Sequence, residues 1–121
     1  MPMTGTDIIF FVSLHTQRTY MFIYNVTNKV SHDIEAEWLI WMKETHIPEL
    51  ISTRLFIDFR ILRLLDTDEA DGITYAIQYF CHARSSYDTY IAEFAAQMRS
   101  KAYEKWGTRV IAFRTLMEVI N

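Results

Sequence analysis

The sequence predicts an α+β fold with the ferredoxin-like order βαββαβ, in which a four-stranded antiparallel sheet carries two helices on one face. Two observations support this prediction. From Met21 onward, segments that alternate apolar and polar residues and segments with helical spacing follow one another in that order. The 121 residues are 50% hydrophobic and 15% aromatic, which is enough for one packed core. We therefore expect residues 21–121 to form a single ferredoxin-like domain.

The first strand and the first helix are predicted over residues 21–30 and 31–46. The strand, MFIYNVTNKV, alternates and is rich in aromatic and β-branched residues, and Ser31 can cap the helix that follows it. Pro48 disfavours α geometry at the preceding residue, so the helix should end or kink near His46 and a short helical turn should begin at the proline. The apolar stripe of this helix is Ile34, Trp38, Trp41, Met42 and Thr45.

A hairpin and a second helix come next. The runs FIDFRILRLL, residues 56–65, and ITYAIQYFCH, residues 73–82, are expected to pair across the acidic turn DTDEADG. The second helix is predicted from caps at Ser85 or Ser86 to a stop near Trp106 and Gly107. The last strand is expected over residues 109–120. The stripe of the second helix is Tyr87, Tyr90, Ile91, Phe94 and Met98.

Alternation divides the strand residues into two faces of the sheet. One face is apolar enough to lie under the helices: Phe22, Tyr24, Val26, Ile57, Phe59, Ile61, Tyr75, Ile77, Tyr79, Ile111 and Phe113. The other face is mixed: Ile23, Asn25, Thr27, Asp58, Arg60, Leu62, Ala76, Gln78, Phe80, Ala112, Arg114 and Leu116. The mixed face is too apolar for water and too polar for a core, so we predict a homodimer through this open face. Its charged residues, Asp58, Arg60, Arg114 and Glu118, could bind an anion, but ion pairs across the dimer are the simpler interpretation.

Charge, cysteine content and the N-terminal residues limit the function classes. A net charge of −3 gives no reason to expect a nucleic-acid partner, and one cysteine, Cys81, excludes an internal disulfide and favours the cytoplasm. The apolar run at residues 8–12 is far shorter than the roughly 20 residues of a membrane span. Because the regular pattern begins at Met21, we interpret residues 1–20 as an N-terminal extension. Our hypothesis is that this extension is an artefact of a start site assigned upstream of Met21.

The phrases IYNVT, EWLIWMKETHIPE, RLLDTDEADGITYAIQYF and FRTLMEVI together resemble a small bacterial family classified as a domain of unknown function. The resemblance runs from Met21 to Ile120, and members of that family begin at the position of Met21. The family is similar to the dimeric α/β-barrel group, in which two ferredoxin-like subunits stack sheet to sheet. The resemblance implies this fold and a dimer. It implies no reaction, because oxygenases without cofactors, isomerases and stress-response proteins share the scaffold.

His46 is the candidate catalytic residue, because an imidazole near neutral pH can act as an acid or a base if it faces a cavity. In the dimeric α/β-barrel group a similar histidine, followed by x-Pro at the end of the first helix, often borders the ligand cavity. The alternative is that His46 only caps the last helical carbonyls. The candidate ligand-binding residues could line an aromatic pocket or could simply fill the core: Tyr24, Trp38, Trp41, Tyr75 and Tyr79.

The remaining motifs predict no metal and no cofactor. DTDEAD lacks the spacing of a calcium loop, and the four histidines, His15, His32, His46 and His82, have no zinc-site spacing. No Gly-rich phosphate loop or nucleophile elbow is present. RNA-recognition domains have the same topology, but Gln78 occupies a position where their RNA-binding motif has an aromatic ring. Amino-acid-sensing regulatory domains also share this topology and are a minor alternative.

Two functions stay open at this point. The first is a small cytoplasmic dimer that binds or senses a small molecule, or that serves an interaction role. The second is a cofactor-independent oxygenase or isomerase with His46 as acid or base. A cavity that reaches His46 is the feature that separates them, because a filled space with His46 in solvent would exclude the enzyme.

Overall fold

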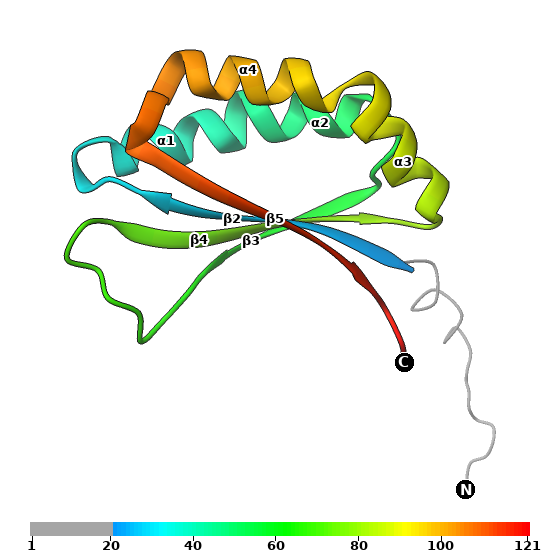
Figure 1. The fold of residues 1–121 in the computed structure, drawn as a ribbon, viewed down its shortest axis with the longest axis horizontal. Coiled ribbons are helices and arrows are strands. Elements are labelled where there is room, and N and C mark those ends of the chain that lie inside the picture. Colours follow the sequence, from blue (N-terminus) through cyan, green and yellow to red (C-terminus); the bar gives the residue numbers. More distant parts are fainter. Residues whose placement is uncertain (1–20) are drawn as a thin grey trace, which may run out of the picture.

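The fold was described for residues 21–121 in a computed structural model (Figure 1). The predicted extension, residues 1–20, and His15 with it lie outside the described residues. The elements in chain order are β2 (Phe22–Val30), η2 (His32–Ile34), α1 (Glu35–Trp41), η3 (Met42–His46), α2 (Ile47–Ser52), β3 (Asp58–Arg63), β4 (Ile73–Cys81), α3 (Arg84–Glu93), α4 (Ala95–Trp106), η4 (Gly107–Arg109) and β5 (Val110–Glu118).

The described strands form one antiparallel sheet with the order β3-β4-β2-β5. Figure 1 shows α1, α2 and α4 in a layer on one side of this sheet, while no described element covers the other side. The predicted α+β ferredoxin-like fold is confirmed, including the hairpin of β3 and β4. None of the helices among residues 21–121 is both long and apolar enough to span a bilayer.

The second helix differs from the prediction in its start and in its continuity. It begins at Arg84 after an extended Ala83, and neither Ser85 nor Ser86 caps it with a side chain; the Ser86 N–H instead donates to the Ala83 carbonyl, 3.1 Å away. At Phe94 the backbone leaves helical geometry (φ −124°, ψ −31°), which separates α3 from α4. Apolar spacing alone does not reveal this break, because the hydrophobic stripe continues through it: Tyr90 and Met98 are both buried.

The pairing of β5 with β2 corrects the predicted faces. Thr27 pairs with Phe113 and Val26 pairs with Arg114, so Ile111 and Phe113 lie on the open face, whereas Ala112, Arg114, Leu116 and Glu118 lie under the helices. The alternation within β5 cannot show which of its residues face the helices, because both alternate sets contain apolar side chains. The register with the partner strand decides this. The open face is therefore more apolar than predicted, and Arg114 and Glu118 do not share it with Asp58 and Arg60.

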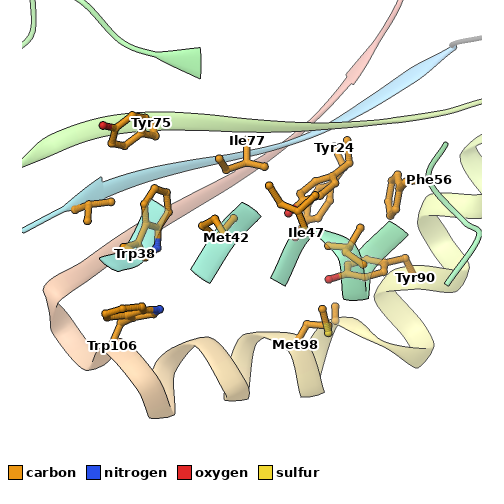
Figure 2. Close-up of a cluster of buried hydrophobic side chains, with 14 of the residues drawn as sticks. Tyr24, Trp38, Met42, Ile47, Phe56, Tyr75, Ile77, Tyr90, Met98 and Trp106 are labelled. Carbon is orange, nitrogen blue, oxygen red and sulfur yellow. The ribbon is translucent and has the colours of Figure 1, made fainter. Parts of the chain in front are cut away.

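The core lies between the helices and the sheet (Figure 2). Trp38 and Met42 of the first helical segment, Ile77 of the sheet and Met98 of α4 are all buried there. Gly72 fits at the edge of this core for a steric reason, because a Cβ at that position would overlap the carbonyl of Val30.

Candidate functional site

A pocket of about 300 Å³ lies between the helices and the sheet. Its walls come from α1, η3 and α4, and its floor comes from β2, β4 and β5. Figure 2 shows Trp38 and Met42 on one side and Trp106 and Met98 of α4 on the other. The volume reaches the lower end of the range for small-molecule sites, which are concave and mostly apolar with a few polar groups.

His46 reaches the pocket because the proline two residues later changes the helix without ending it. Pro48 has no N–H to donate and its ring crowds the carbonyl four residues earlier, so a regular α-helix cannot continue. Residues 42–46 widen into a π-helical turn, in which the Ile47 N–H bonds the Met42 carbonyl, and α2 starts with the proline in its first turn. The change of helical geometry falls where the sequence predicted a break, but Ile47 keeps α-helical dihedrals (φ −62°, ψ −47°) and the helix does not end at His46. The predicted capping alternative is absent, because the helical path continues through residue 46 and the buried His46 Nδ1 has no hydrogen-bond partner among the described residues. Single π-helical turns are frequent at functional sites.

The imidazole of His46 is neutral at pH 7. Burial lowers its pKa to about 4, the positive charges of Arg114 and Lys101 act in the same direction, and Glu49 opposes them. The ring stacks on Trp41, with 4.6 Å between the ring centroids and 24° between the planes. His46 is therefore held in place by packing, and it presents an uncharged ring with one donor and one acceptor nitrogen.

Trp106 closes one end of the pocket. Its ring meets Trp41 edge to face at 5.8 Å, it is 6% exposed, and its buried indole N–H has no acceptor among the described residues. Gly107, with φ +59°, ends α4 directly after Trp106 and lets the chain turn into β5. An indole N–H can only donate, so this group is available to an oxygen or nitrogen acceptor in the pocket.

Three tyrosines stand at the opposite end. Tyr24 packs on Tyr79 and Tyr90, with ring centroids 6.0 Å and 5.6 Å away. Burial raises the pKa of both Tyr79 and Tyr90, so both phenols stay protonated at neutral pH. The Tyr24 hydroxyl accepts a long hydrogen bond of 3.4 Å from the Arg99 guanidinium.

Five of the six residues predicted from the sequence line this one pocket: Tyr24, Trp38, Trp41, His46 and Tyr79. Tyr75 does not line it. Its ring packs on Trp38 at 5.5 Å and its hydroxyl donates to the Glu35 carboxylate, outside the pocket. Burial, and then the bond to Glu35, raises the pKa of Tyr75 to about 12.

The prediction missed the α4 wall and the β5 floor. Met98, Ala102 and Trp106 are four residues apart and lie on one side of α4, so extending the stripe past Met98 would have found them. Arg114 was missed because it was assigned to the opposite face of the sheet.

A second hollow of about 510 Å³ lies on the far side of Trp41 and Trp106, which border both spaces. It is a surface feature, bordered by exposed side chains such as Ile40 and Lys105. The pocket with His46 is the better candidate because buried aromatic side chains enclose it.

The other sequence candidates lie elsewhere. Within residues 21–121 no cluster of three or more metal-ligating side chains occurs. The acidic turn is held by the Arg63–Glu69 ion pair at 2.9 Å and by a hydrogen bond of 2.7 Å between His32 Nε2 and the Glu69 carbonyl oxygen. Cys81 is buried on β4, where burial raises the pKa of its thiol.

Comparisons with known proteins agree with this fold. A family model described as "Domain of unknown function (DUF4286)" matches residues 21–120. A solved dimeric ferredoxin-like protein from an uncultured marine organism is similar over 84% of this chain and 97% of its own, with 16% identity and a TM-score of 0.63. No protein with a curated description matches this chain.

Proposed function

We propose that this chain, which belongs to the DUF4286 family, is a homodimeric protein that binds a small molecule in the pocket beside His46. The observation that supports binding is the pocket itself, in which three tryptophans, four tyrosines and a neutral histidine surround about 300 Å³ of space. Aromatic walls with a few unpaired polar groups are typical of sites that orient an apolar ligand.

A matched pair of substitutions on α4 tests this binding. Ala102 lines the pocket, whereas Ala96 is exposed on the same helix. Ala102→Phe places a ring in the space and removes no existing contact, and Ala96→Phe adds the same ring to the outside. Compounds that raise the melting temperature or quench the tryptophan fluorescence of the parent protein should act on Ala96→Phe and not on Ala102→Phe. The proposal fails if Ala102→Phe responds as the parent does.

The dimer is proposed to form through the open face of the sheet. Leu62, Ile111 and Phe113 are 42%, 53% and 67% exposed there, although a sheet face left in water usually carries polar side chains. Four strands about 4.8 Å apart, with nine residues at about 3.3 Å each in the longer ones, give a face of nearly 600 Å². A standard interface buries about 600–1,000 Å² of surface per partner, so one sheet face reaches the lower end of this range.

A polar row crosses this face and can set the register of the two subunits. Arg60 pairs with Gln78, Gln78 with Asn25 and Asn25 with Thr115, so four polar side chains lie side by side across the sheet. Polar groups within an apolar interface favour one alignment over others. Two such sheets stacked face to face would form the dimeric α/β barrel that the sequence resemblance implies.

Light scattering tests the dimer. The parent protein should show twice the mass of one chain at micromolar concentration. Phe113→Lys should show the mass of one chain, because it would bury a charge in the interface, whereas Ile40→Lys, on the outer side of α1, should stay a dimer. A parent mass equal to one chain removes the proposal.

A cofactor-independent oxygenase or isomerase is the second candidate, and the position of His46 favours it. The imidazole borders the pocket and its Nδ1 is unpaired among the described residues. Because burial lowers its pKa to about 4, His46 can accept a hydrogen bond or a proton from a substrate but is not charged in advance as an acid at pH 7. His46→Ala should abolish turnover of any substrate found in a metabolite screen, and an equally active variant refutes this role.

A cytoplasmic location is also part of the proposal. Its support is the single cysteine, Cys81, which is free and buried and therefore suits a reducing compartment. The net charge of −3 supports the expectation that the chain binds no nucleic acid.

A further inference from the structure

The charged side chains that line the pocket are all of one sign. Among the described residues that line it, two are arginines, Arg99 and Arg114, and none is an aspartate or a glutamate. The chain as a whole carries a net charge of −3, so the cationic lining does not reflect the average composition. A cleft lined by one sign of charge and bounded by apolar walls attracts ligands of the opposite sign.

The two guanidinium groups come from different elements and act on the same region. Arg99 extends from α4 to the hydroxyl of Tyr24, while Arg114 lies under the helices beside Val26 on the edge strand β5. Both positive charges counteract the rise in the pKa of Tyr90 that burial causes, so both lie within electrostatic reach of this ring.

Neither arginine has an ion pair within residues 21–121. The carboxylate that interacts most strongly with His46 is that of Glu49, and it is bound to Lys101 at 3.1 Å across α2 and α4. Both arginines are partly exposed to solvent, and apart from the long hydrogen bond from Arg99 to the Tyr24 hydroxyl, no hydrogen bond or ion pair of their guanidinium groups is found among the described residues, so donors remain for a carboxylate.

A buried donor without a partner also lines the pocket. The indole N–H of Trp106 is buried and has no acceptor among the described residues, so an acceptor that enters the pocket can satisfy it. A ligand with oxygen atoms meets this requirement, whereas a hydrocarbon or an organic cation does not. Trp38, Trp41 and Met42 line the same pocket with large apolar side chains.

Building on the proposed function, we propose that the ligand is a small aromatic or similarly flat carboxylate, whose anionic group binds Arg99 and Arg114 and whose apolar body packs on the tryptophans. The space of about 300 Å³ equals about ten water molecules of about 30 Å³ each, which limits the ligand to one or two fused rings with small substituents. Bidentate recognition of a planar carboxylate is the contact for which a guanidinium is best suited.

The test compares two probes of nearly the same shape, 2-naphthoate and its neutral amide, 2-naphthamide, by isothermal calorimetry and tryptophan quenching. The parent protein should bind the carboxylate about ten- to a hundredfold more tightly than the amide, because hydrogen bonds to a charged group are stronger. Arg99→Gln with Arg114→Gln should reduce this ratio to about one and leave the amide affinity nearly unchanged. The matched control is Arg84→Gln on the exposed side of α3, which should keep the parent ratio.

The outcomes distinguish a wrong ligand class from a wrong proposal that the pocket binds a small molecule. Equal affinity of the parent protein for both probes overturns the carboxylate assignment and leaves small-molecule binding intact. A ratio that falls equally in Arg84→Gln also overturns it, because the preference would then come from the overall charge of the protein. If neither probe binds, and Ala102→Phe matches the parent protein towards every compound tested, both the assignment and the proposed function are wrong.

Discussion

Replacing His46 by glutamine should remove a specific part of the acid sensitivity of this protein. In the unfolded chain His46 binds a proton with a pKa near 6.5, whereas burial lowers the folded value to about 4. Between these two values the unfolded chain takes up more protons than the folded one, so acid favours unfolding. The stability that His46 contributes is fully present above pH 6.5 and is lost as the pH falls towards 4.

The magnitude follows from the two pKa values. At about 1.4 kcal/mol per pH unit, the difference between 6.5 and about 4 corresponds to a total loss of about 3 kcal/mol. Between pH 7.5 and pH 5.0 the same two values give a loss of about 2 kcal/mol. The neighbours that set this behaviour face the ring from three elements: Trp41 and Glu49 from its own helical segment, Lys101 from α4 and Arg114 from β5.

Urea unfolding at fixed protein concentration measures the effect. The free energy of unfolding of the parent protein should fall by about 2 kcal/mol more than that of His46→Gln between pH 7.5 and pH 5.0. Carboxylates that titrate in this range contribute to both proteins and cancel in the comparison. His82→Gln, at an exposed histidine, should keep the parent pH dependence. If His46→Gln and the parent lose the same free energy, the imidazole is not buried and neutral as described.

Three further predictions concern residues outside the pocket. Tyr75→Phe should lower the free energy of unfolding by about 1 kcal/mol, because the hydrogen bond to Glu35 is lost. The affinity for 2-naphthoate should stay unchanged, and weaker binding would show that Tyr75 belongs to the site. Gly72→Ala should destabilise by about 1–3 kcal/mol in chemical unfolding because the added methyl group meets the Val30 carbonyl, and unchanged stability would mean that the backbone relaxes. Cys81 should react with a thiol reagent only at the rate of unfolding, and rapid labelling of the native protein would contradict its burial.

Local sequence signals predicted the fold well because apolar residues recur with a strand period or a helix period within each element. Alternation in residues 21–30 and helical spacing around Trp38 are properties of neighbouring residues, and Pro48 marks a kink through its missing N–H. These signals were enough to place His46 at a change of helical geometry with aromatic residues nearby. Five of the six site residues that they predicted line the pocket, because those residues lie on the strongly patterned first strand, first helix and third strand.

Other features of the site depend on contacts between distant segments. Whether Arg114 faces the helices or the open face follows from its pairing with Val26, which lies far away in the chain. Whether Tyr75 lines the pocket depends on how Trp38 and Glu35 pack around it. The unpaired indole of Trp106 arises only where α4 meets the first helical segment.

The sequence by itself determined the order of elements, the apolar stripes and the position of the change in helical geometry before Pro48, because these depend on backbone preferences and on side chains a few residues apart. The tertiary structure alone decided that a space remains between α4 and the sheet, that its lining is cationic, and that His46 is buried enough to stay neutral. The reason is physical: a cavity, a desolvated imidazole and an unpaired donor are properties of how the elements pack against one another, and no single element contains them.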